Sequence, residues 1–142
     1  MLQGLWWGIV TVAFLPIIAS AADLKIDIIG LRNTEGVLRL SLYNDDSTFL
    51  KSQGRLASLK LMHLHAHQVR ACFADLLPGM YAVTVHHDEN DDGELNRNAV
   101  GLPREGYGFS NDARRPLGPP SFAQAAVTVA NEDKIIKITL RY

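Results

Sequence analysis

Apolar residues recur at every second position in several short stretches of this 142-residue chain. In the stretch 24–31, Leu24, Ile26 and Ile28 alternate with charged residues. A period of two places the apolar side chains of a strand on one face, so this pattern predicts a half-buried β-strand. Strand-like stretches follow along the rest of the chain, at 37–43, 59–65, 68–76, 77–87, 124–130 and 134–142.

Turn residues between the stretches predict how the strands connect. We expect 24–31 and 37–43 to form a hairpin, because only the five residues Arg-Asn-Thr-Glu-Gly separate them. The stretches 59–65 and 68–76 are expected to form a second pair, and 124–130 and 134–142 a third hairpin. The segment 99–123 is rich in glycine and proline, which excludes a regular helix or a central strand. About seven short strands and no long amphipathic helix predict an all-β fold, a single antiparallel sandwich.

The N-terminus predicts export. The run from Leu5 to Ala19 is almost wholly apolar and leads into Ala19-Ser20-Ala21, a small-x-small triplet typical of a signal-peptide cleavage site. Cleavage is expected after Ala21 or Ala22, which gives a signal peptide at 1–21 and a β-sandwich domain at 22–142, in the periplasm or outside the cell. The apolar run is shorter than the ~20 residues of a membrane-spanning helix, so we expect no membrane span after cleavage. An uncleaved anchor is the alternative, because the first residues carry no Lys or Arg.

The charge balance argues against nucleic acid as a partner. The chain has 14 Lys and Arg against 15 Asp and Glu, a net charge of −1. A nucleic-acid-binding surface requires a surplus of basic residues.

The order of motifs after Phe73 resembles a known family. Phe-Ala-Asp-Leu-Leu-Pro-Gly-Met-Tyr-Ala-Val leads into His-Asp-Glu-Asn-Asp-Asp-Gly-Glu-Leu-Asn, then Gly-Leu-Pro-Arg-Glu-Gly-Tyr-Gly-Phe-Ser-Asn and Gly-Pro-Pro-Ser-Phe. This order is similar to that of the bacterial exported family catalogued as domain of unknown function 2141. The resemblance covers nearly all of 22–142 and implies an immunoglobulin-like or transthyretin-like (prealbumin-like) sandwich outside the cytoplasm. It does not imply a reaction.

The acidic stretch 88–96 predicts a calcium site. Asp88, Asn90 and Asp92 occupy alternate positions, Gly93 follows, and Asn96 lies three residues further on. In a loop of the EF-hand type these are ligand positions 1, 3 and 5, the turn glycine and position 9, and the residue at position 7 gives its backbone carbonyl. The predicted calcium ligands are therefore Asp88, Asn90, Asp92, Glu94 and Asn96.

The loop also departs from the EF-hand pattern. Position 12, which carries a bidentate glutamate in EF-hands, falls on Ala99, and the preceding segment is a strand. An oxygen from elsewhere in the chain or a water molecule would have to complete the site. A metal-free polar turn is the alternative, because Asp, Asn and Gly are also the common residues of turns.

Two further sets of residues are candidate sites. His63 and His65 would share one face of a strand and could bind Cu²⁺ or Zn²⁺, with exposed strand histidines as the alternative. Tyr107 and Phe109 lie between small residues and could stack on a sugar or a peptide, or fold back to cap one end of the sandwich.

The sequence carries none of the signatures that would indicate an enzyme. There is no Gly-x-Ser-x-Gly, His-Glu-x-x-His or phosphate-binding loop. We therefore expect a non-enzymatic, exported β-sandwich with a calcium-binding loop. The alternatives are a module that binds a glycan, peptide or protein through Tyr107 and Phe109, and a metal-handling protein that uses His63 and His65.

Overall fold

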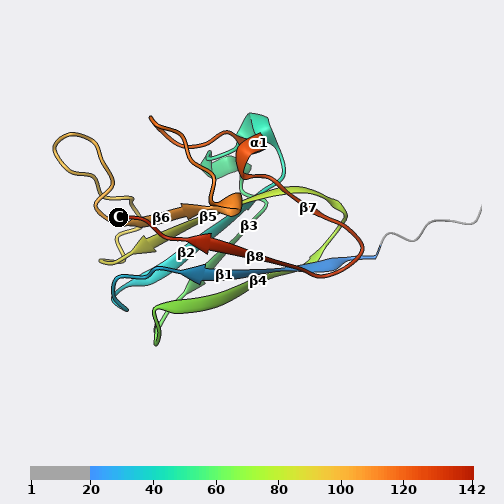
Figure 1. Ribbon diagram of the computed structural model, residues 1–142, viewed down its shortest axis with the longest axis horizontal. Coiled ribbons are helices and arrows are strands. Elements are labelled where there is room, and N and C mark those ends of the chain that lie inside the picture. The colour runs from blue at the N-terminus through green and yellow to red at the C-terminus, as the bar shows by residue number, and fades with distance from the viewer. Residues whose placement is uncertain (1–19) are drawn as a thin grey trace, which may run out of the picture.

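A computed structural model describes residues 20–142, which form two facing β-sheets (Figure 1). One sheet has the order β4-β1-β8 and the other β3-β2-β5-β6, with β7 paired to β5. The strands are β1 (Ala22–Ile29), β2 (Val37–Tyr43), β3 (Ala57–Leu61), β4 (Gln68–Leu76), β5 (Gly79–Asp88), β6 (Gly106–Phe109), β7 (Val127–Val129) and β8 (Lys134–Thr139). The helical elements are short: η1 (Asp46–Thr48), η2 (Ser52–Gly54), η3 (Ser110–Asp112) and α1 (Phe122–Ala125). The predicted all-β class is confirmed.

The alternating pattern correctly identifies the buried face of each principal strand. Leu24, Ile26 and Ile28 of β1 are fully buried, and they meet the buried leucines of β2 in one shared core. Burying the apolar face of each sheet against the other is what stabilises this arrangement.

The predicted strand pairing is wrong at all three pairs. β1 pairs with β4 and, in parallel, with β8, whereas β2 pairs with β3 and β5 in the other sheet. The stretches 24–31 and 37–43 therefore form no hairpin, and 59–65 does not pair with 68–76. Residues 124–130 do not pair with 134–142 either, because α1 begins at Phe122 and β7 pairs with β5. Each short connection crosses from one sheet to the other, and a period of two reports only the buried face, not the partner strand.

The crossing from β1 to β2 depends on Gly36. This residue has φ = 64°, and a Cβ at its position would lie 2.0 Å from the backbone oxygen of Asp88. Only glycine allows the chain to pass so close to the end of β5. The turn that starts β2 is thereby held against the start of the acidic loop.

The predicted signal peptide at 1–21 lies almost entirely outside the described residues. Within residues 20–142 no helix is long and apolar enough to cross a membrane.

The packing of the two sheets against each other can be tested by truncating one buried and one exposed isoleucine and comparing the loss of stability. Ile26 is fully buried, whereas Ile135, on β8, is 59% exposed. We expect Ile26→Ala to lower the free energy of unfolding by about 2–5 kcal/mol, because it opens a cavity in the core. Ile135→Ala should change it by no more than about 0.5 kcal/mol. Urea unfolding measures both, and equal losses would contradict the packing.

Candidate functional site: the acidic loop and the open sheet face

The acidic loop starts from a buried carboxylate at the end of β5. Asp88 is fully buried, and its Oδ2 accepts a hydrogen bond from Arg39 Nε at 2.6 Å. The backbone N–H groups of Asp92 and Gly93 donate to the same carboxylate at 3.1 and 2.9 Å. Burial acts to raise the pKa of Asp88, but the hydrogen bonds from Arg39 and Gly93 hold this pKa below its ordinary value. Asp88 is therefore an ionised anchor that closes the loop.

Three of the five predicted calcium ligands converge within the loop. Asn90 Nδ2 lies 2.8 Å from Asp92 Oδ2 and 3.1 Å from Asn96 Oδ1, and Asn96 Nδ2 lies 3.0 Å from Asp92 Oδ2. The backbone N–H of Glu94 donates to Asp92 Oδ1 at 2.8 Å. This N–H group, followed by the two side-chain amides, lowers the pKa of Asp92. The side chains at positions 3, 5 and 9 thus contact one another through hydrogen bonds, and calcium binding by them stays a prediction.

Cationic side chains of the protein pair with two further acids of the loop, Glu89 and Asp91. Arg32 pairs with Glu89, and its Nε donates to Oε1 at 2.9 Å. Arg39 and Lys60 both pair with Asp91, at 2.6 and 2.9 Å. Mutual repulsion of the acids therefore does not require a metal ion, since arginine and lysine already offset it.

Glu105 joins this loop, and no spacing in the sequence indicated it. Its side chain is almost fully buried and accepts hydrogen bonds from His86 Nε2 at 3.0 Å and from the backbone N–H groups of Glu89 and Asn96. Possible ligand atoms of His86, Asp88 and Glu105 all lie within 4.8 Å of one another. One imidazole and two carboxylates could hold a divalent cation. Arg39 opposes a cation here, because its guanidinium already balances the charge of Asp88.

His63 and His65 do not form the predicted row on a strand. β3 ends at Leu61, and His63 has φ = 57°, so both residues lie in the exposed connection to β4. The strand predicted for 59–65 is therefore too long. Across residues 20–142, the metal-ligating group of three or more side chains that the structure contains does not include them. Copper or zinc binding at His63 and His65 stays a prediction without a geometric basis.

Tyr107 and Phe109 lie on a strand, in a segment where the sequence predicted a loop. β6 is short and pairs with β5 at the sheet edge, and its burial alternates. Gly108 faces the core, because a Cβ there would lie 2.6 Å from Ile138 Cγ2. Tyr107 and Phe109 consequently face outward, with ring centroids 6.2 Å apart in an edge-to-face arrangement.

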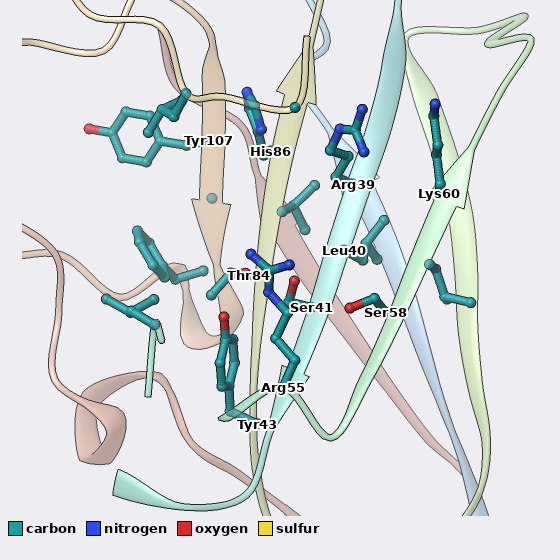
Figure 2. Close-up of a pocket in the computed structure, with 17 residues that line it drawn as sticks. Arg39, Leu40, Ser41, Tyr43, Arg55, Ser58, Lys60, Thr84, His86 and Tyr107 are labelled. Atoms are coloured by element: carbon teal, nitrogen blue, oxygen red, sulfur yellow. The ribbon is translucent and has the colours of Figure 1, made fainter. Parts of the chain in front are cut away.

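These rings line a groove on the outer face of the second sheet (Figure 2). The groove has a volume of about 400 Å³, within the range of small-molecule sites. Strand register places Ser58, Ser41, Thr84 and Phe109 in one row across β3, β2, β5 and β6. Lys60, Arg39, His86 and Tyr107 form the next row. Gly93 and Leu95 of the acidic loop close one end, and Leu50 lies at the margin.

The floor of the groove is polar and free to bind. Within residues 20–142, the side-chain hydroxyls of Ser41, Ser58 and Thr84 make no hydrogen bond to protein, although all three line the groove. Hydroxyl groups that face a concave surface without protein partners are available to a polar ligand. Aromatic rings thus lie at one side of the groove, and hydroxyl groups lie along its floor.

Two facing sheets define a small β-sandwich-like protein with an open groove on the outer face of one sheet. The chain belongs to the family described as "Uncharacterized protein conserved in bacteria (DUF2141)", whose model matches residues 26–137. The predicted family is confirmed, and the immunoglobulin-like or transthyretin-like assignment stays a prediction. No curated protein and no solved structure matches the chain.

The Asp88 anchor predicts a pH-dependent effect on stability. Arg39→Met should lower the free energy of unfolding by about 1–3 kcal/mol at pH 7, because a buried carboxylate loses its charged donor. Because its pKa is lowered in the fold, Asp88 stabilises the folded state at pH values above ~3.9, the ordinary pKa of an aspartate. This contribution is lost as the pH falls through the lowered pKa. The difference between wild type and Arg39→Met should therefore narrow from pH 7 to pH 2 in urea unfolding.

Lys60→Met is the control, because it removes an exposed cation that also pairs with Asp91. We expect it to cost less than about 1 kcal/mol at every pH. An Arg39→Met effect as small as this, or one independent of pH, would contradict the role of Asp88.

Proposed function

We propose that this protein is an exported, non-enzymatic binding module that holds a saccharide in the groove on its second sheet. The observation that carries the proposal is the placement of Tyr107 and Phe109 beside a row of free hydroxyls. Export is supported by the predicted leader at 1–21, and a binding role by the absence of catalytic motifs from the sequence.

The chemistry of the groove favours a sugar over a wholly apolar ligand. A sugar ring presents C–H groups on one face and hydroxyls around its edge. Aromatic side chains bind the first, and hydroxyl or charged side chains bind the second. Thr84 lies directly opposite Phe109 on the neighbouring strand, so one ligand can reach both kinds of contact. A peptide strand added at the sheet edge would instead rely on backbone hydrogen bonds.

A glycan array tests the proposal. Wild-type protein produced from the full chain should bind a subset of glycans, and Tyr107→Ala and Phe109→Ala should each weaken that binding at least tenfold through the loss of ring contacts. Ile135→Ala removes an exposed apolar side chain from the other sheet and should leave binding unchanged. No binding by wild type, or equal binding by all four proteins, would contradict a saccharide function of the groove.

Calcium binding by the loop 88–96 is the second candidate function. The convergence of Asn90, Asp92 and Asn96 supports it, because two amides and a carboxylate offer the hard oxygens that calcium prefers. The amides would have to turn their oxygen atoms toward the ion. Without a position-12 carboxylate, we expect an affinity near the ~10⁻⁴–10⁻³ M of extracellular modules.

Thermal unfolding followed by circular dichroism tests calcium binding. Millimolar Ca²⁺ should raise the melting temperature above that in EDTA or in millimolar Mg²⁺, because a ligand that binds only the folded state stabilises it. Asp92→Asn should abolish the rise. Asp46→Asn, in the exposed turn η1, should retain it. Identical melts of wild type in all three solutions would establish the loop as a metal-free turn.

A further inference from the structure

The charged side chains that line the groove are all basic. They are Arg39, Arg55 and Lys60, and within the described part of the chain no Asp or Glu lines the groove with them. Arg39 and Lys60 point their charge at Asp88 and Asp91, at the end of the sheet. Their charge is thus already balanced by the acidic loop.

Arg55 differs from the other two basic residues in having no acidic partner. Across residues 20–142, its guanidinium forms no ion pair within 4.0 Å and no hydrogen bond to protein. Figure 2 shows the side chain reaching over the groove, in the region of Ser41 and Thr84. A guanidinium presents five N–H donors in a planar fork that matches a carboxylate. Its place beside free hydroxyls marks the groove floor as electrostatically complementary to an anion.

The backbone holds Arg55 in place without using its side chain. Arg55 follows η2, and its N–H donates to the carbonyl of Ser52 at 3.5 Å. The next residue, Leu56, donates its N–H to the carbonyl of Leu42 on β2 at 2.8 Å. These two bonds attach the Arg55 backbone to the sheet, so that the guanidinium starts from a fixed point above the groove.

We infer that the ligand is an acidic saccharide, one that carries a uronic-acid carboxylate. Arg55 binds the carboxylate, the hydroxyls of Ser41 and Thr84 bind the sugar edge, and Tyr107 and Phe109 contact the ring face. This inference rests on the proposed saccharide function and adds the charge of the ligand to it. Two strand spacings, about 10 Å, separate Ser41 from Phe109 along one row, so the ligand reaches across three neighbouring strands.

A matched pair of disaccharides tests the inference. Cellobiose and cellobiouronic acid differ only in the oxidation of one CH₂OH group to a carboxylate. In a titration followed by ¹⁵N–¹H NMR, both should shift the amide resonances of Ser41, Thr84 and Phe109. Cellobiouronic acid should bind wild type at least tenfold more tightly, because a charge-assisted, two-point hydrogen bond adds to the shared contacts.

Two variants assign the preference to Arg55. Arg55→Gln should reduce the affinity for cellobiouronic acid to the affinity that the same variant has for cellobiose. Lys137→Gln removes the same charge from the outer face of β8 and should preserve the tenfold preference. Inorganic phosphate at the same concentration should neither reproduce the shifts nor displace the acidic disaccharide.

The outcomes separate this inference from the function on which it rests. Equal affinities of wild type for the two disaccharides, or a preference that survives in Arg55→Gln, would overturn the inference and leave the saccharide function standing. Displacement by phosphate would overturn the choice of a sugar acid in favour of a general anion site. Absence of groove shifts with both disaccharides would overturn the inference and the proposed function together.

Discussion

The ion pair between the buried carboxylate of Asp88 and Arg39 is the interaction on which the arrangement of the open sheet face depends. Asp88 ends β5, accepts hydrogen bonds from the amides of Asp92 and Gly93, and holds the guanidinium of Arg39 on the neighbouring strand. A buried charge is tolerated only where such partners surround it. The same carboxylate therefore closes the acidic loop and fixes the loop against the end of the open sheet.

That arrangement explains why one sheet face stays open. Arg39 and Lys60 extend toward Asp91, so the acidic loop closes one end of the groove instead of covering its floor. At the other margin, Phe49, which lies between η1 and η2, packs edge-to-face against Tyr43 and Phe122. Between these two ends the floor presents hydroxyls and aromatic rings, and the guanidinium of Arg55, which has no acidic partner among residues 20–142, reaches over it (Figure 2). Ion pairs thus balance the charge at the end of the groove near the acidic loop, whereas the centre of the groove is basic.

The sequence pattern predicted which face of each strand is buried, but it did not predict which strands pair with each other. Alternation located Leu24, Ile26 and Ile28 in the core because burial of a strand face follows directly from its period. It did not reveal that β1 runs parallel to β8, since such a pairing depends on how both sheets close around one core. Tyr107 and Phe109 alternate with glycine, as residues on one face of a strand do. The glycines, however, favoured a loop at this segment.

The site was predictable only where its residues are neighbours in the chain. The convergence of Asn90, Asp92 and Asn96 follows from local spacing. Glu105 reaches the loop from beyond a long connection, and Arg39 and Arg55 reach the site from other strands and turns, so no local pattern could indicate them. Contacts of this kind are set by the tertiary fold.

The most direct measurement is a crystal structure of the protein soaked with cellobiouronic acid. The groove on the second sheet is expected to hold the disaccharide, with the carboxylate of the sugar within hydrogen-bond distance of Arg55 and a sugar ring against Tyr107 or Phe109. Density for the disaccharide at another surface, or an empty groove at saturating concentration, would contradict the assignment of this face as the binding surface.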